Sequence, residues 1–207
     1  MKKKGILAVV SGFSGSGKGT LMKELLARYP EQYALSISAT TREPRVGEEH
    51  GREYFFVSTE EFEQMIADQA LVEYAQYVGH YYGTPRSYVL EQMEAGRDVV
   101  LEIEMQGAVK VKEKFPDTLL LFVTPPSAKV LEQRLRGRNT ETEEVIQSRL
   151  KRAVEEADYM PRYDYLLVND DLETCVGSMH ELIQSQHART ADNLEFIQEM
   201  KQELKQL

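Results

Sequence analysis

An apolar run near the start of the chain, Ile6–Val10, leads directly into the glycine-rich segment SGFSGSGKGT at residues 11–20. This order predicts a buried strand, a tight turn and a helix that begins near Lys18. Glycine lets several backbone N–H groups point at one anion, and the helix N-terminus adds partial positive charge. The spacing of Gly12, Gly17 and Lys18 is that of a phosphate-binding loop. An ordinary glycine-rich turn, the alternative, leaves the lysine without a role.

The loop departs from the usual pattern at the position after the lysine. That position is Gly19, and a hydroxyl follows only one residue later, at Thr20. A hydroxyl directly after the lysine ordinarily binds Mg²⁺ beside the nucleotide phosphates. This ligand is therefore absent or displaced, and Thr20 is the candidate that replaces it.

Composition limits the classes of protein to which the chain can belong. Its 207 residues are 42% hydrophobic and 29% charged, which is typical of one compact globular domain. There is no run of about 18 apolar residues, so no membrane span is expected, and the apolar segment after Met1–Lys4 is too short for a signal peptide. Cys175 is the only cysteine, which excludes internal disulfides and favours a cytoplasmic location. The net charge of −9 argues against a large nucleic-acid surface.

Later apolar runs resemble the first one and alternate with helical patterns. The strand candidates are Val99–Ile103, Leu119–Val123 and Tyr165–Val168, and the helix candidates are residues 20–29, 88–95, 107–115 and 128–136. Near-continuous apolar strands are typical of a parallel sheet covered on both faces. The alternation predicts an α/β fold with right-handed crossovers.

Two segments interrupt the alternation. The first contains β-like pieces at Tyr54–Val57 and Leu71–Tyr74, with a helix between them that Ser58 and Glu61 would cap. The second is highly charged, and Thr140 with Glu143 fits another capping box there. We expect a subdomain inserted at about residues 37–84, a solvent-facing cover at about 137–157, and a core made of 1–36, 85–136 and 158–207.

The last part of the chain, residues 172–205, predicts one or two helices. Leu194, Ile197, Met200 and Leu204 recur at helical spacing and form an apolar face suited to docking. A short coiled coil is also compatible with this spacing, but the pattern supports it only weakly. The oligomeric state stays undecided between a monomer and a homo-oligomer.

Two arginines three residues apart, Arg42 and Arg45, lie in the first interrupting segment, with tyrosines nearby. A guanidinium keeps its charge, and its planar fork matches a phosphate group. The pair is therefore a candidate grip for a second phosphate. Two solvated surface side chains are the alternative.

The chain resembles the guanylate kinase family over nearly its whole length, through shared stretches that are longer than these motifs. The shared stretches are residues 11–20, SATTREPRVGEEHGREYFFVS at 38–58, Glu73, HYYGT at 80–84, EIEMQGA at 102–108, RLRGRNTETEE at 134–144 and LLVND at 166–170. The block at 38–58 and the HYYG segment are specific to that family. The phosphate-binding loop is not.

The resemblance implies a P-loop nucleoside monophosphate kinase-like α/β fold. Its parts would be a parallel central sheet flanked by helices, an inserted subdomain for the nucleoside monophosphate and a helical lid. The implied activity is transfer of the ATP γ-phosphate to GMP, and to dGMP, with Mg²⁺ as the cofactor of ATP. The implied place of this reaction is purine nucleotide metabolism in the cytoplasm.

The resemblance also assigns residues to the ATP side of the site. These are Gly12, Phe13, Ser14, Gly15, Ser16, Gly17, Lys18, Gly19 and Thr20, with Asn169 near the adenine. The implied catalytic residues are Lys18, Arg42 and three lid arginines, Arg134, Arg138 and Arg149. Arg136 and Arg152 are expected to be solvated.

The GMP side follows from the same resemblance. Arg42, Arg45, Tyr54 and Tyr82 correspond to the phosphate grip, Gly83 and Thr84 lie beside it, and Ser38, Glu73 and Glu104 correspond to the guanine readers. Independent chemistry supports Glu73, because guanine presents two adjacent donors that match one carboxylate. Adenine presents an acceptor there, and a site built on hydrogen bonds rejects such an analogue strongly.

Two carboxylates carry open assignments. Glu104 stands where the family is expected to have aspartate, so its carboxylate reaches about one bond further. Glu102 and Glu104 both end a core strand near the loop and are candidates for holding hydrated Mg²⁺, and their apolar neighbours predict that both are half-buried. Adenylate-kinase-like sequences also contain GKGT, and there Mg²⁺ can be held largely through water.

Three rival functions remain. A non-catalytic guanylate kinase-like domain that binds proteins is disfavoured, because this chain keeps Gly12, Gly17 and Lys18 and is expected to stand alone. A kinase for another nucleoside monophosphate is disfavoured by Glu73 with Ser38, although Glu104 keeps it open. The third rival is a P-loop protein that acts on another phosphorylated small molecule.

Overall fold

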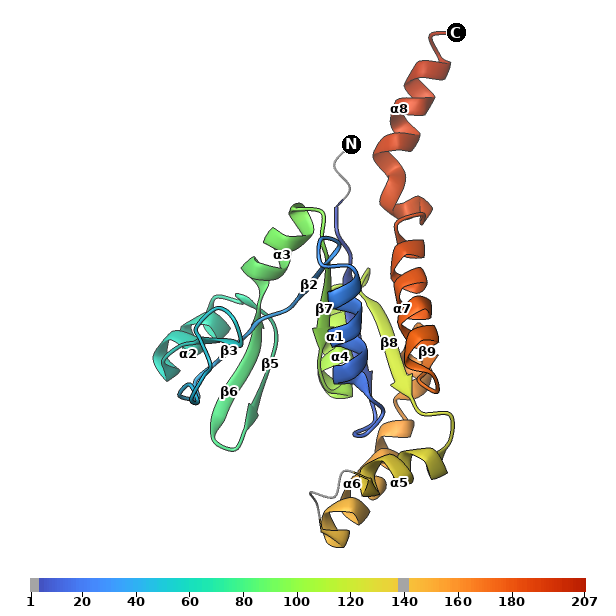
Figure 1. Ribbon diagram of the computed structural model, residues 1–207. Helices are drawn as coiled ribbons and strands as arrows, with labels where there is room; N and C mark the ends of the chain where they lie inside the picture. The colour runs from blue at the N-terminus through green and yellow to red at the C-terminus, as the bar shows by residue number, and fades with distance from the viewer. Residues whose placement is uncertain (1–3, 138–141) are drawn as a thin grey trace.

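The structure is a computed structural model that describes residues 4–137 and 142–207. Its centre is a five-stranded parallel sheet with the strand order β2-β7-β1-β8-β9 (Figure 1). The strands are β1 (Leu7–Gly12), β2 (Tyr33–Leu35), β7 (Asp98–Glu102), β8 (Leu119–Thr124) and β9 (Tyr165–Val168). The four predicted strands are confirmed. The edge strand β2 was not predicted, because three residues are too few to show a hydrophobic period.

Helices cover both faces of this sheet. One face packs against α1 (Lys18–Arg28) and α7 (Leu172–Gln186), and the other packs against α3 (Arg86–Glu94) and α4 (Met105–Lys114). The side chains of β1 alternate between the two cores, with Val10 on the α1 side and Val9 on the α4 side. Both cores are apolar, which explains why β1 is a continuous hydrophobic run. The parallel α/β architecture is therefore confirmed.

The first interrupting segment forms a second sheet, with strand order β4-β3-β6-β5. Its strands are β3 (Ser38–Thr40), β4 (Tyr54–Phe56), β5 (Leu71–Tyr77) and β6 (His80–Pro85). Helix α2 (Thr59–Ala67) packs on it through the fully buried Phe62. The predicted capping box of α2 is confirmed: Glu61 N donates to Ser58 Oγ, and Ser58 N donates to the Glu61 carboxylate. Strands β3 and β6 were not predicted.

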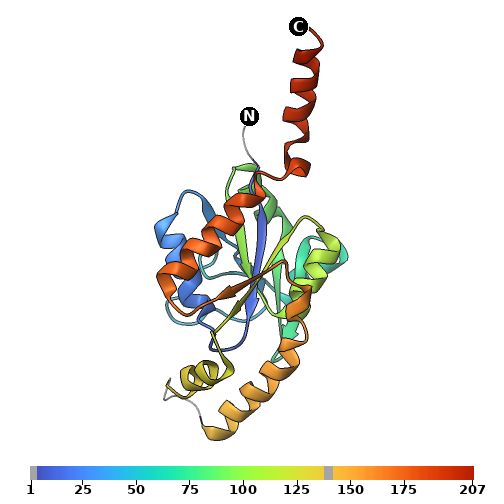
Figure 2. The same ribbon diagram turned by 90° about the vertical axis from the view of Figure 1, so that its right-hand side faces the viewer.

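The charged segment lies at the carboxyl end of the sheet. It contributes α6 (Glu143–Ala157) beside α5 (Ala128–Arg136), followed by the short 3-10 helix η1 (Met160–Arg162). Figure 2 shows α5 and α6 below the sheet. The predicted start of α6 was wrong, because its N-cap is Thr142. Thr140 lies outside the described residues.

The final segment forms two helices, which confirms the prediction of one or two. After α7 and the 3-10 helix η2 (Thr190–Asn193), α8 (Leu194–Leu204) extends away from the body, at the end opposite to α5 and α6 (Figures 1 and 2). Among residues 4–137 and 142–207, no helix has the length and apolar content needed to cross a membrane.

Candidate active site

The phosphate-binding loop connects the end of β1 to the start of α1, where the sequence predicted it. Gly17 is the N-cap of α1 and has a left-handed backbone with φ of 90°. At Gly12 a Cβ atom would lie 2.1 Å from the carbonyl oxygen of Val123, so only glycine fits beside β8. The ammonium of Lys18 donates to the carbonyl oxygens of Gly12 at 2.7 Å and Phe13 at 3.0 Å. These bonds hold the lysine head inside the curve of the loop.

Two residues predicted to contact ATP support the loop from behind. The buried Asn169 donates from Nδ2 to the carbonyl oxygen of Ser16 at 2.8 Å. Arg134 donates from Nη2 to the carbonyl oxygen of Asn169 at 2.9 Å. Asn169 and Arg134 therefore hold the loop and each other, which is a positioning role in addition to any contact with nucleotide.

Other residues of the phosphate-binding loop contact α5 and α6. The Phe13 ring is buried with Phe122, Leu131 and Leu135, so only its backbone can face an anion. The guanidinium of Arg149 on α6 donates to Ser14 Oγ. Arg134 of α5 and Arg149 of α6 are thus both brought to the loop. Arg138 lies outside the described residues.

The two carboxylates after β7 do not have the predicted burial. Glu102 and Glu104 are both exposed, because the apolar neighbours in the sequence turn to the opposite side, into the core. Glu104 forms an ion pair with Arg152 of α6 at 2.9 Å, and its side chain is 74% exposed. Arg152 is exposed as predicted but is also paired with Glu156 at 3.1 Å.

Glu156 was missed by the sequence reasoning. It is half-buried on α6, and burial raises the pKa of its carboxyl, although the positive charges of Arg152 and Lys18 oppose that rise. The spacing of Arg152 and Glu156 on one helix suggests their pairing. Their approach to Lys18 and Glu104 depends on where α6 lies on the core.

The predicted guanine reader Glu73 lies in β5 at the edge nearest the core. Its Oε1 accepts a hydrogen bond from the hydroxyl of the fully buried Thr84 at 2.9 Å. Burial raises the pKa of the Glu73 carboxyl, and the Thr84 hydroxyl lowers it by less. At Gly83 a Cβ atom would lie 2.8 Å from the Glu73 carbonyl oxygen, which explains the glycine at this position of β6, beside β5. The Oε2 atom of Glu73 faces Gly107 of α4, since a Cβ atom built at Gly107 would lie 3.7 Å from that oxygen.

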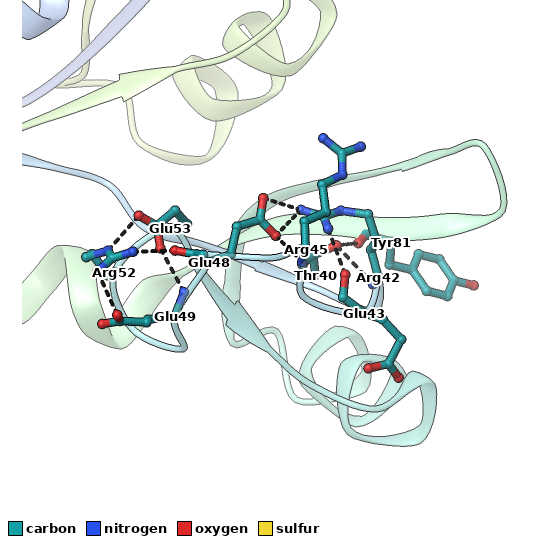
Figure 3. A network of polar contacts seen from close by, with 10 residues as sticks. Thr40, Arg42, Glu43, Arg45, Glu48, Glu49, Arg52, Glu53 and Tyr81 are labelled. Atoms are coloured by element: carbon teal, nitrogen blue, oxygen red, sulfur yellow. Dashed lines mark hydrogen bonds and ion pairs between the residues drawn. The ribbon is translucent and has the colours of Figure 1, made fainter.

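The arginine loop is mostly exposed, but its central ion pair, Arg42 with Glu48, is half-buried (Figure 3). Arg42 Nη2 donates to both carboxylate oxygens of Glu48, at 3.0 and 2.9 Å, and Arg42 Nη1 donates to the carbonyl oxygen of Glu43. Arg45 contributes its backbone N–H to the same Glu48 carboxylate at 2.8 Å. In Figure 3 the guanidinium of Arg45 points away from Glu48.

Aromatic rings flank Arg42. Its guanidinium carbon lies 5.4 Å from the centroid of Tyr54, and the Tyr54 and Tyr82 rings meet edge to face at 6.1 Å. Ser38 of β3 is the register partner of Tyr54 in β4. The structure therefore brings together Arg42, Tyr54 and Tyr82 of the predicted phosphate grip. The same small sheet carries two of the predicted base readers, Ser38 in β3 and Glu73 in β5.

The contacts form two groups that are joined through the start of α4. The loop residues contact Asn169, Arg134 and Arg149, whereas the arginine loop contacts its own tyrosines and carboxylates. Glu104 stands at the N-cap position of α4 without a side-chain capping bond and pairs with Arg152 of α6. Gly107, about one turn later, faces Glu73. A parallel sheet with a phosphate-binding loop, an inserted second sheet and two covering helices defines a P-loop protein of the nucleoside monophosphate kinase type.

Comparison with known proteins narrows this class. The guanylate kinase family model matches residues 4–186. The chain is 46% identical over 203 residues to a guanylate kinase of Caldanaerobacter subterraneus, covering 98% of both, and 48% identical to that of Streptococcus thermophilus, covering 91% and 90%. The crystal structure of guanylate kinase from Anaplasma phagocytophilum matches with a TM-score of 0.69 and 30% identity, covering 92% of this chain and 90% of that one. The chain belongs to the guanylate kinase family.

Proposed function

We propose that the protein transfers the γ-phosphoryl group of ATP to GMP, giving ADP and GDP. The observation that carries this proposal is the half-buried carboxylate of Glu73, held by Thr84 on the same small sheet as Tyr54, whose ring lies beside Arg42. A carboxylate matches the two donors of guanine, and a guanidinium beside tyrosines matches a phosphate. The phosphate-binding loop supports ATP as the phosphoryl donor, and membership of the guanylate kinase family supports GMP as the acceptor.

In this proposal the residues position two anions and neutralise charge. Lys18 and the loop amides bind the outer phosphates of ATP, while Arg42 and Arg45 hold the GMP phosphate. Arg134 and Arg149, with Arg138 from the lid, stabilise the charge on the transferring group. No protein nucleophile is required, because an oxygen of the GMP phosphate is already anionic near neutral pH.

The same proposal divides the chain into three functional parts. The core comprises residues 1–36, 85–136 and 158–207, the GMP-binding part about 37–84, and the lid about 137–157. The separate second sheet and the position of α6 over the phosphate-binding loop support this division. Closure of the lid would exclude water, which otherwise accepts the phosphoryl group.

Mg²⁺ is proposed to arrive with ATP. In the described part of the chain, no group of three or more His, Cys, Asp or Glu side chains could hold a metal ion by itself. Mg²⁺ on a nucleotide needs only one or two carboxylates beside phosphates and water, so this finding is compatible with it. Glu102, exposed at the end of β7 and paired in register with Val10, and Thr20, exposed in the first turn of α1, are the candidate ligands. When bound, the ion would neutralise phosphate charge.

The remaining proposals concern the setting of the reaction. We expect dGMP to be a second acceptor, the reaction to serve purine nucleotide metabolism in the cytoplasm, and nucleic acid not to be a partner. The composition supports two of these expectations, since a net charge of −9 opposes nucleic-acid binding and one buried thiol suits a reducing compartment such as the cytoplasm.

A coupled assay of ADP release tests the function. GMP, dGMP, AMP, CMP and UMP are offered in parallel with ATP and Mg²⁺. Rapid turnover with GMP and little with AMP supports the proposal. Faster turnover with another nucleotide means that Glu104 has altered the base pocket, and GMP binding without any turnover favours the protein-binding function.

A further inference from the structure

The helix α6 carries a polar stripe that contacts the phosphate-binding loop and the start of α4. The stripe consists of Arg149, Arg152 and Glu156, whose helical spacing puts them on one side of α6. Arg149 donates to Ser14 of the loop, and Arg152 pairs with Glu104 at the start of α4. Apolar residues of the same helix fix its rotation by packing into the core cluster around Phe13 and Phe122: Ile146, Leu150 and Ala153.

Arg152, in the middle of the stripe, uses two parts of its guanidinium. Its Nε lies 3.1 Å from Oε1 of Glu156, one turn further along α6, and its Nη2 lies 2.9 Å from Oε1 of Glu104. The Glu156 side chain is only 15% exposed, so it anchors the guanidinium on its own helix. The negative charge of Glu104 is the largest cause of the raised pKa of Arg152. Arg152 therefore connects α6 to the start of α4.

Glu104 lies on the side of α4 that faces the proposed base site. Gly107, three residues later, faces the Oε2 atom of Glu73, and residues three apart share one side of a helix. Met105, the residue after Glu104, is buried in the same core cluster as Ile146 of α6, so packing holds the two helices in a fixed relation. The Glu104 side chain itself is 74% exposed. A long, exposed side chain loses conformational entropy when it binds a ligand, and a restraint applied beforehand reduces that loss.

We infer that Arg152 is a positioning residue for the recognition of GMP, and that it acts by holding the Glu104 carboxylate where guanine meets it. This inference rests on the proposed transfer to GMP. A carboxylate has two oxygens that both accept hydrogen bonds, so Oε1 can stay with Arg152 while Oε2 accepts from guanine. Guanine presents one N–H at N1 and two on its amino group. Glu73 matches the first and one of the amino N–H bonds, which leaves the other for Glu104.

The length of Glu104 fits this role. Its extra methylene, relative to the aspartate expected at this position, extends the carboxylate from the start of α4 to the guanidinium on α6. Glu104 and Arg152 are therefore expected to act as a unit, in which the arginine restrains the longer side chain. Aspartate at position 104 would reach guanine without needing the arginine.

Steady-state kinetics of Arg152→Gln with ATP and GMP test the inference. KM for GMP should rise roughly two- to fivefold, the range of exposed ion pairs, while kcat and KM for ATP stay unchanged. Lys151→Gln, the matched control, removes the same charge from the exposed neighbouring position and should behave like the parent. An unchanged KM for GMP in Arg152→Gln overturns the inference. A lower KM would mean that Arg152 and guanine compete for Glu104, and a lower kcat alone would mean that Arg152 acts on the phosphates; both results overturn it.

A double-mutant cycle tests whether Arg152 acts through Glu104. In a Glu104→Gln or Glu104→Asp background, Arg152→Gln should raise KM for GMP no further, because the ion pair is already broken. Arg152→Lys keeps the positive charge and should stay closer to the parent than Arg152→Gln. Additive effects on KM in the cycle, or an Arg152→Lys variant as impaired as Arg152→Gln, overturn the inference. Thermal unfolding confirms that each variant is folded.

The parent chain distinguishes the failure of this inference from the failure of the proposed function. A parent that does not turn over GMP overturns both together. A parent that turns over GMP, with an Arg152→Gln variant of unchanged KM, overturns only the positioning role of Arg152.

Discussion

The two sides of the site rest on different supports. The phosphate-binding loop follows β1, whose six residues are all buried, and it is held by buried contacts to Asn169 and by the Lys18 bonds to its own carbonyls. The arginine loop is mostly exposed, and its contacts are ion pairs with its own carboxylates. The ATP side is therefore shaped by the core, whereas the GMP side is shaped by contacts that a ligand can replace.

This difference has an electrostatic consequence. At Lys18 an incoming phosphate competes with the two carbonyl groups that hydrogen-bond the ammonium, and it also meets the charge of Glu156, which acts on Lys18 through space. At Arg42 it competes with the full negative charge of Glu48. Phosphate binding at Lys18 therefore adds an anion to a site that is already formed. Phosphate binding at Arg42 requires the guanidinium to exchange Glu48 for the phosphate. Four substitutions test this contrast.

The largest expected effect is that of Lys18→Ala. The charge that follows the transferring phosphoryl group is lost, and turnover should fall roughly 10³-fold or more. GMP binding, measured by calorimetry, should stay nearly unchanged because the two sides are supported separately. Lys23→Ala, an exposed lysine on the same helix, is the control. Near-normal turnover in Lys18→Ala would remove the lysine from the mechanism.

The second-largest expected effect is that of Glu73→Gln on the recognition of GMP. An amide cannot accept from both guanine donors, so kcat/KM for GMP should fall roughly 10- to 100-fold. Glu63→Gln, an exposed glutamate of α2, should have no such effect. A Glu73→Gln enzyme with unchanged GMP kinetics would show that another group reads the base.

The same variant has a pH signature. Burial raises the pKa of Glu73 in the folded state, so the folded state binds more protons than the unfolded state between the ordinary and the raised pKa. The stability contributed by protonated Glu73 is therefore lost as the pH rises through that window. Thermal unfolding should show Glu73→Gln to be at least as stable as the parent at pH 7. The stability of Glu73→Gln relative to the parent should decrease as the pH is lowered. A relative stability that increases on acidification would contradict a raised pKa for Glu73.

Asn169→Ala tests the support of the loop. It leaves the Ser16 carbonyl without its buried donor, which costs about 1 to 3 kcal/mol of folding stability. If Asn169 acts by holding the loop, KM should rise by the same factor, about tenfold, for ATP and for GTP as donors. A rise for ATP alone would mean that Asn169 contacts the adenine instead. Asp170→Ala, at the exposed neighbouring position, is the control.

The smallest effect is expected for Glu48→Gln. Removing the carboxylate that occupies Arg42 should lower KM for GMP roughly two- to fivefold, the range of weak ion pairs, because a neutral amide competes less strongly for the guanidinium than a carboxylate does. The effect should fade as salt is added. Glu49→Gln, which breaks a pair with Arg52 instead, is the matched control. A higher KM in Glu48→Gln would show that Glu48 positions Arg42 instead of competing for it.

The sequence was sufficient for features that depend on neighbouring residues. The strand before the phosphate-binding loop, the start of α1 at Lys18 and the capping box of α2 all follow from patterns within about ten residues. The six-residue β6 was missed because its sequence HYYGTP shows no hydrophobic alternation. The strands β2 and β3 were missed because strands of three residues gain their hydrogen bonds from distant partners. The exposure of Glu102 and Glu104 was mispredicted for the same reason, since apolar neighbours in sequence do not show which way a side chain turns.

The sequence by itself determined the class of chemistry, because glycines, a lysine and a helix start within ten residues are enough to build an anion site from the backbone. It also determined the family, through the long block at residues 38–58. Only the tertiary structure decided that Asn169 supports Ser16, that Arg152 reaches Glu104 and that Glu48 occupies Arg42. It alone left the apolar face of α8 uncovered. These contacts depend on how whole helices and sheets pack, and local spacing carries no information about that.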